Sequence, residues 1–128
     1  METLIDQKIE IAPELLAQLH TQVEKQVIIH GTIRVTPFVQ HSIRLWPTIY
    51  LIPKGTVIHC KLIKSFNIVL YPKWQLIAQG KTHNFTLIFE GLPADCKQFD
   101  LVEVIPEPNG FDVRNIERNE QDVYNVSV

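Results

Sequence analysis

The chain has 128 residues, of which 45% are hydrophobic and 20% are charged. This length and composition are typical of one globular domain that buries a core without a disulfide framework or a structural metal. With a formal net charge of −2, the chain has no electrostatic feature that favours nucleic acid or an anionic membrane surface. We therefore expect a single domain over residues 1–128, with neither nucleic acid nor membrane among its partners.

The N-terminus lacks the features of a secretion signal. Glu2 and Asp6 lie where such a signal carries basic residues, and no uninterrupted apolar stretch follows them. No segment of the chain approaches the roughly 20 apolar residues that are needed to cross a bilayer. These features predict a cytoplasmic protein.

Residues 1–25 form an N-terminal segment with one helix candidate. The run PELLAQLH, which starts at Pro13, places Leu15, Leu16 and Leu19 on one stripe, with proline at the first helical position. A helix of about two turns is marginal alone, so it would form only by docking. Leu15, Leu16 and Leu19 are therefore candidate interface residues, which would contact either the rest of this chain or a partner.

From residue 26 onward the hydrophobic period changes from about 3.6 to about 2 residues, which indicates strands. Val27, Ile29, Ile33 and Val35 face one way and predict a half-buried strand that Pro37 ends. Further strands are expected at residues 43–52, with an interruption at Trp46-Pro47, and at 57–63, 66–70, 73–78, 84–90, 99–104, 111–117 and 123–128.

The number and spacing of these segments predict the fold class. Short strands separated by turn residues, without alternating helices, are typical of a β-sandwich or a small barrel. Within residues 57–63 we expect Ile58, Cys60 and Leu62 to face the core. The turn signals include Pro53-Lys54-Gly55 and Asn109-Gly110.

The segment from Asn84 to Glu103 carries the clearest strand pattern. Phe85, Leu87 and Phe89 alternate with polar residues and are expected in the core. Residues 91–95, GLPAD, form a turn, after which a second apolar strand follows. We expect two consecutive strands that meet at this turn, with the polar residues of the segment at the surface.

A family resemblance rests on several of these runs. FTLIFEGLP, followed by FDLVE and then by GFDVRNI, resembles a group of small bacterial immunoglobulin-like β-sandwich domains of unassigned function. IRLWPTIYLI and FNIVLYP match the middle strands of the same domains in order, so the resemblance covers about residues 26–128. It implies an immunoglobulin-like antiparallel β-sandwich of roughly seven to nine short strands after the N-terminal segment, and it implies no site residue.

The cysteines and histidines give weak chemical signals. Cys60 and Cys96 are too few for a disulfide framework and are expected to be free thiols in a reducing compartment. Asp95 and Lys97 flank Cys96 and shift a thiol pKa in opposite directions, so the sequence does not predict an activated nucleophile. The five histidines lack the close spacing of zinc ligands and predict no metal site.

Four carboxylates lie in or beside the segment from Asn84 to Glu103. Glu90, Asp95, Asp100 and Glu103 would suit paired acid/base chemistry if two of them faced one cleft. In a domain of this size, outward-facing acids beside apolar strands more often provide solubility and edge protection. We interpret them as surface residues, with Asp100 bonded to the local backbone.

Aromatic residues near prolines are the best binding candidates. Trp46, Tyr50, Tyr71 and Trp74 lie at expected strand ends, where a ring can be half exposed. Such rings form a stacking surface for a sugar or a peptide, and they also occur at the edges of ordinary sandwich cores. No glycine-rich phosphate loop is present in the sequence.

These features together favour a non-catalytic protein-interaction or assembly module without a cofactor. Its partner would be another protein or a second copy of the chain, bound through a strand edge, a sheet face or the N-terminal leucines. The alternative is a small ligand-binding protein or a minor enzyme that uses an aromatic pocket or Cys96.

Overall fold

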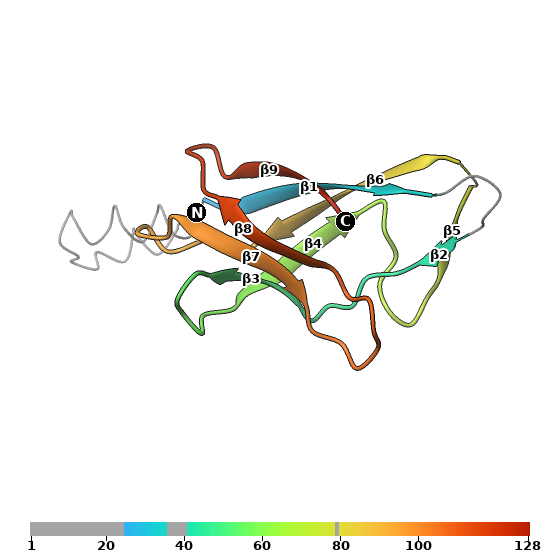
Figure 1. The fold of residues 1–128 in the computed structure, drawn as a ribbon, viewed down its shortest axis with the longest axis horizontal. Coiled ribbons are helices and arrows are strands. Elements are labelled where there is room, and N and C mark those ends of the chain that lie inside the picture. Colours follow the sequence, from blue (N-terminus) through green and yellow to red (C-terminus); the bar gives the residue numbers. More distant parts are fainter. Residues whose placement is uncertain (1–24, 36–40, 79) are drawn as a thin grey trace, which may run out of the picture.

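The computed structural model describes residues 25–35, 41–78 and 80–128, which form nine strands and no helix (Figure 1). The all-β expectation is therefore confirmed for the described part of the chain. The strands are β1 (Val27–Arg34), β2 (His41–Ile43), β3 (Ile49–Pro53), β4 (Cys60–Phe66), β5 (Gln75–Ile77), β6 (Thr82–Phe89), β7 (Gln98–Glu103), β8 (Asp112–Glu117) and β9 (Val123–Ser127). The helix expected from Pro13, with Leu15, Leu16 and Leu19, lies outside the described residues.

Seven strands form one mixed sheet in the order β8-β7-β3-β4-β6-β1-β9, whereas β2 and β5 form a separate antiparallel pair. Neighbours in the large sheet are antiparallel except β1 and β9, which run parallel. The sheet curls into a nearly closed barrel rather than the clear two-layer sandwich that we expected. Period-two alternation marks one buried face per strand, and that face can line either architecture.

Aromatic contacts link strands that are distant in the sheet order. Tyr124 of β9 meets Phe99 of β7 edge to face, with ring centroids 4.9 Å apart. Phe85 of β6 stacks with Phe111, which directly precedes β8, at 5.9 Å. Both contacts cross the interior, so they bring the β8 and β9 ends of the sheet toward one another.

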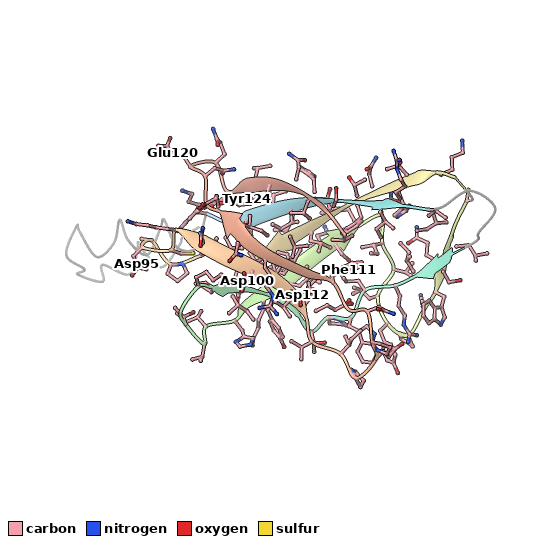
Figure 2. The ribbon with its side chains drawn as sticks, viewed as in Figure 1. Asp95, Asp100, Phe111, Asp112, Glu120 and Tyr124 are labelled. Atoms are coloured by element: carbon pink, nitrogen blue, oxygen red, sulfur yellow. The ribbon has the colours of Figure 1, made fainter. Side chains whose placement is uncertain are left out.

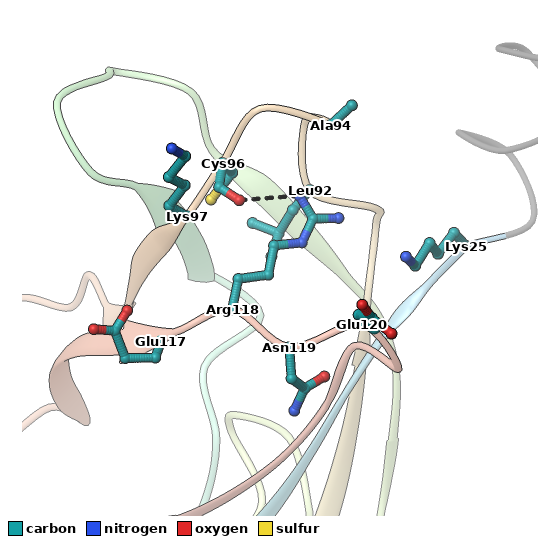
Figure 3. A pocket seen from close by; sticks show the side chains of 9 residues that line it. All are labelled: Lys25, Leu92, Ala94, Cys96, Lys97, Glu117, Arg118, Asn119 and Glu120. Carbon is teal, nitrogen blue, oxygen red and sulfur yellow. Dashed lines mark hydrogen bonds between the residues drawn. The ribbon is translucent and has the colours of Figure 1, made fainter.

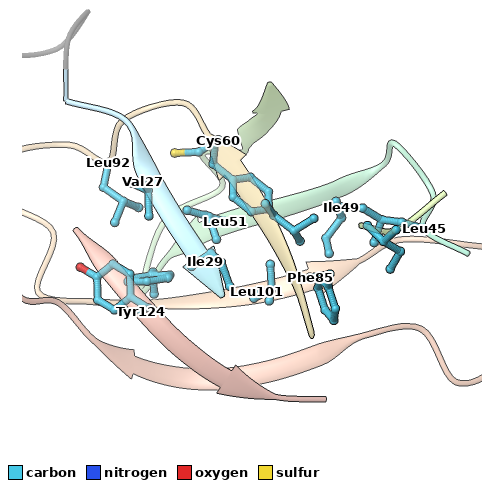
Figure 4. Packing of buried hydrophobic residues seen from close by; sticks show 14 residues of the cluster. Val27, Ile29, Leu45, Ile49, Leu51, Cys60, Phe85, Leu92, Leu101 and Tyr124 are labelled. Carbon is cyan, nitrogen blue, oxygen red and sulfur yellow. The ribbon is translucent and has the colours of Figure 1, made fainter. Parts of the chain in front are cut away.

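The core fills the interior of this barrel (Figure 4). The expected inward positions Phe85, Leu87 and Phe89 are all buried, as are Val27 and Ile29. The other buried apolar side chains of the cluster are Leu45, Ile49, Leu51, Cys60, Ile68, Leu92, Phe99, Leu101 and Tyr124. The alternation therefore identified the buried face of β1 and β6 correctly.

Gly31 allows β1 to pass over an aromatic ring. It pairs with Phe85 across β1 and β6, and a Cβ atom at Gly31 would lie 2.2 Å from the phenylalanine ring. Such a distance is far inside van der Waals contact. Only glycine fits here without displacing the ring.

The expected strands between residues 57 and 70 are partly wrong. Strand β4 begins at Cys60, and Ile58 is exposed rather than inward. The backbone before β4 is engaged locally instead, since Ile58 donates its N–H to Thr56 Oγ1 and the His59 ring bonds the Val57 carbonyl. Strand β4 ends at Phe66 and no strand forms at 67–70, because Asn67 adopts a left-handed φ of 61° directly after β4.

Strands β6 and β7 do not lie side by side as the turn at residues 91–95 suggested. Strands β4 and β3 separate them in the sheet. The connection from Gly91 to Lys97 therefore crosses one end of the barrel. There the Sγ of Cys60, on β4, lies 3.6 Å from the Gly91 carbonyl oxygen. Turn chemistry defined a reversal of direction but not the partner of each strand.

Candidate functional site

Three of the four predicted aromatic residues gather around one arginine. The rings of Trp46 and Tyr71 stack with centroids 3.9 Å apart. The Arg44 guanidinium lies 4.5 Å from the Tyr71 ring centroid and 3.9 Å from that of Trp74. We call Arg44, Trp46, Tyr71 and Trp74 the aromatic cluster.

The pairing of β2 with β5 positions this cluster. Ser42 lies opposite Leu76, and residues two positions away along each strand project to the same side. Arg44 and Trp74 therefore share the outward face of the pair, whereas Ile77 is buried beneath it. Leu45 and Leu70 form an isolated backbone bridge that joins the segments leading into the cluster.

Arg44 is held in place by hydrogen bonds as well as by the rings. Its Nη2 donates to Glu107 Oε1 at 2.8 Å, and its Nη1 donates to the Pro72 carbonyl at 3.4 Å. The arginine charge is thus neutralised by a carboxylate that comes from the loop between β7 and β8. The guanidinium fixes the rings by cation–π contacts, which are stronger when the cation is largely removed from water.

The cluster leaves aromatic surface open to solvent. Trp74 is 57% exposed and Tyr71 is 43% exposed, although both are held by neighbouring groups. Tyr50, the fourth predicted residue, lies elsewhere on β3, where it meets His59 edge to face at 4.8 Å. The structure therefore brings together Trp46, Tyr71 and Trp74 but not Tyr50.

A hollow of about 480 Å³ adjoins the cluster and is lined by both tryptophans and by polar groups. This volume lies within the range of about 300–1,000 Å³ that is usual for small-molecule sites. Buried Glu103 lies at its wall, where its carboxylate accepts the N–H groups of Trp46 at 2.8 Å and of Phe111 at 3.0 Å. Sequence analysis placed Glu103 at the surface, which is wrong, because the carboxylate ties two loops together inside the molecule.

A second hollow, of about 550 Å³, surrounds Arg118 (Figure 3). The Arg118 guanidinium donates to both carboxylate oxygens of Asp122 at 3.1 Å. It also donates to the carbonyl oxygens of Pro93 and Cys96, and the second of these bonds is drawn in Figure 3. Arg118 therefore fastens the connection between β6 and β7 to the turn between β8 and β9.

The partner of Arg118 is fully enclosed. Asp122 is 0% exposed and also accepts the hydroxyl of Tyr124 at 2.8 Å. Burial opposes ionisation of Asp122, but the hydrogen bonds from Arg118 and Tyr124 outweigh it and lower the pKa of the carboxyl. For Tyr124, burial first and the adjacent Asp122 second raise the pKa to about 12.

These contacts make the Arg118 group a structural clamp rather than an open site. Among the described residues, no buried side-chain nitrogen or oxygen lacks a hydrogen-bond partner. Sequence analysis missed the Arg118–Asp122 pair, and the only local signal was the opposite charge four positions apart. That spacing is common on exposed surfaces and does not reveal burial.

The thiols are poor nucleophiles. Cys60 and Cys96 are both free, as the sequence predicted. Burial is the main cause that raises the pKa of Cys60 to about 11. Burial also raises the pKa of Cys96, although Arg118 opposes this effect. Little thiolate is present at neutral pH, which disfavours a role for Cys96 in covalent chemistry.

The predicted acid cluster is dispersed, and Asp100, like Glu103, has a structural role. Asp95 is exposed whereas Asp100 is buried, so the surface position expected for Asp100 is wrong (Figure 2). Asp100 accepts the backbone N–H of Asn115 at 2.9 Å and contacts Lys54 and Arg114 at 3.2 Å. Burial opposes ionisation, but these bonds, led by that of Asn115, lower the pKa of Asp100. The carboxylate holds the bulge of β8 and is not free for acid/base work.

The described histidines make single local bonds. His30 Nδ1 lies 2.9 Å from Thr86 Oγ1, and His83 Nε2 lies 2.7 Å from the Asn67 carbonyl. Within residues 25–35, 41–78 and 80–128, no group of three His, Cys, Asp or Glu side chains is arranged to hold a metal ion. The same residues include no helix that is long and apolar enough to span a membrane.

Comparisons of the chain with protein-family models, with curated proteins and with solved structures found no match. The resemblance to immunoglobulin-like domains therefore stays a prediction, and the site is interpreted from its own geometry.

Proposed function

We propose that this chain is a non-catalytic binding module and that the aromatic cluster is its contact surface. The observation that carries the proposal is that the rings of Trp74 and Tyr71 are exposed to solvent. Arg44, which is itself bonded to Glu107, holds both rings in position. Trp, Tyr and Arg are the residues most enriched among those that dominate binding energy. A rigid exposed ring also loses little conformational freedom when a partner covers it.

The state of the carboxylates and thiols supports a non-catalytic role. Asp100, Glu103 and Asp122 each accept hydrogen bonds from within the chain. The Cys60 and Cys96 thiols have raised pKa values. None of these groups combines the exposure and the free lone pair or thiolate that a nucleophile or a general base requires.

A stability measurement tests whether the cluster is a contact surface or a structural brace. We expect Trp74→Ala to lower the free energy of unfolding by at most about 1 kcal/mol, because its ring is mainly exposed and loses chiefly a cation–π contact. The matched control is Phe85→Ala, which removes a buried ring and should cost about 3–5 kcal/mol. If both substitutions cost the same in urea unfolding, the cluster is a brace and the proposal fails.

Self-association is a second candidate, which the two ends of the sheet favour. Among the described strands, β8 and β9 each have one edge without a neighbour in the sheet. Strand β8 is interrupted by a register shift, and Asn115 within it has a φ of 59°, features that hinder edge pairing. Strand β9 pairs regularly with β1, so its outer edge is the better surface for a second copy.

Light scattering during size-exclusion chromatography tests this second candidate. A dimer whose mass is stable over a wide concentration range would support assembly through β9. Ser127→Pro, which lies at the exposed end of β9, should then weaken the dimer, since proline blocks edge pairing. A strict monomer at high concentration would remove self-association and leave the aromatic cluster as the contact surface.

The relationship to immunoglobulin-like domains is part of the proposal as well. It is supported by the runs FTLIFEGLP and FDLVE, which contribute β6 and β7. The nearly closed barrel of the described residues leaves this relationship to be tested by the structures of related chains.

A further inference from the structure

We infer that the hollow beside Trp74 binds a neutral sugar, with a pyranose ring stacked on the exposed indole and its hydroxyl groups donating to the Glu107 carboxylate at the wall. This inference rests on the proposed function, because it names the ligand class of the same surface. It assigns separate roles to the apolar and the polar sides of the hollow.

The apolar side is the exposed indole of Trp74. Arg44 covers part of this ring at 3.9 Å from the centroid, yet 57% of the residue stays exposed. Trp46 lies at the wall of the same hollow and is fixed by its stack with Tyr71. An indole face carries negative charge density, which suits the row of C–H bonds on one face of a pyranose.

The polar side offers mainly hydrogen-bond acceptors. Glu103 and Glu107 both line the hollow, together with the side chains of Ser42 and Asn109. Glu107 uses Oε1 for Arg44 and is partly exposed, so its carboxylate can accept further bonds. Carboxylates accept hydrogen bonds from hydroxyl groups, and such charge-assisted bonds are stronger than those between neutral groups.

The charges of the hollow argue against other small ligands. Two carboxylates, Glu103 and Glu107, face one cation, Arg44, so an anionic ligand such as a phosphate would be repelled. The space between the aromatic rings that would attract an organic cation is already occupied by the Arg44 guanidinium. A neutral ligand with an apolar face and several hydroxyl groups fits both constraints.

The composition of the chain makes the test specific. The sequence contains two tryptophans, and both Trp46 and Trp74 line the hollow. Intrinsic tryptophan fluorescence therefore reports on this site alone. The full chain is titrated with glucose, galactose, mannose and N-acetylglucosamine, and with linear tetrasaccharides of each, and we expect a saturable change in emission with at least one of them.

Variants then locate the binding. Measured by calorimetry, Trp74→Ala should weaken binding of that sugar at least tenfold, whereas Trp74→Phe, which keeps a ring, should weaken it less. Leu76→Ala is the matched control, since Leu76 is 70% exposed on the same strand pair but does not line the hollow. Its affinity should equal that of the unmodified chain.

The outcomes separate the ligand class from the proposed function. The inference is overturned if none of these sugars gives a saturable change in tryptophan emission. It is also overturned if Trp74→Ala leaves sugar binding unchanged. Binding of N-acetylarginine methylamide in place of the sugars would overturn the sugar class and keep the contact surface. If Trp74→Ala instead destabilises the chain as much as Phe85→Ala does, the proposed function itself fails.

Discussion

The enclosed pair of Arg118 and Asp122 makes the sharpest prediction about stability. Asp122 has a left-handed φ of 56°, which asparagine tolerates, so Asp122→Asn removes the charge without straining the backbone. It leaves the Arg118 guanidinium, which is 13% exposed, without a counter-charge. Removing one partner of a buried pair costs about 3–5 kcal/mol. We expect about 3 kcal/mol, since the asparagine oxygen still accepts one hydrogen bond.

This loss is a large part of the stability of a domain, which is about 5–15 kcal/mol in total. Urea unfolding followed by circular dichroism measures it directly. Arg118→Met with Asp122→Asn should cost clearly less than the sum of the two single substitutions, with a coupling of about 0.5–3 kcal/mol. A loss below about 1 kcal/mol for Asp122→Asn, or strict additivity, would refute the clamp.

The same pair has a defined pH dependence. The pKa of Asp122 is lowered in the folded chain, because hydrogen bonds from Arg118 and Tyr124 outweigh the effect of burial. The contribution of its charge to stability is therefore complete above the unfolded value of about 3.9 and is lost as the pH falls through the lower folded value. The unmodified chain should lose more stability between about pH 4 and pH 2 than the Asp122→Asn variant. Equal losses would contradict the assignment.

Two further predictions concern the core and the thiols. Gly31→Ala should cost about 1–3 kcal/mol in urea unfolding, because its Cβ would meet the Phe85 ring, and adding Phe85→Leu should recover part of that loss. Folded protein at pH 7 should react with Ellman's reagent more slowly at both Cys60 and Cys96 than glutathione does, since both thiols have raised pKa values. Denatured protein should react at the rate of the model thiol, and a fast phase assigned to Cys96 in the folded state would speak against its burial.

Local alternation predicted the strands whose pattern depends on near neighbours. Phe85, Leu87 and Phe89 were assigned to the core, and all three are buried there. The same reasoning failed at Ile58. There β-branched residues precede the start of β4 and lie in an exposed loop. Propensity describes which residues suit a strand, whereas backbone pairing decides where the strand begins.

Buried polar groups were beyond the reach of sequence reasoning. Asp100, Glu103 and Asp122 follow no apolar pattern, and acids are usually exposed. Asp100 and Glu103 are buried because donors from distant segments satisfy their oxygens, whereas Asp122 is satisfied by Arg118 and Tyr124 from its own turn. The donor to Glu103 at Trp46 lies 57 positions away in the sequence.

The sequence by itself determined the all-β class, the buried face of β1 and β6, the free thiols and the three aromatic residues that meet in the cluster. These properties follow from side-chain polarity at neighbouring positions and from residue type. Tertiary structure decided that the sheet curls into a nearly closed barrel, that β6 and β7 are separated, and that Arg44 meets Glu107 from 63 positions away. Such outcomes depend on which distant segments pair. The local pattern of either segment does not reveal the energy of the contact between them.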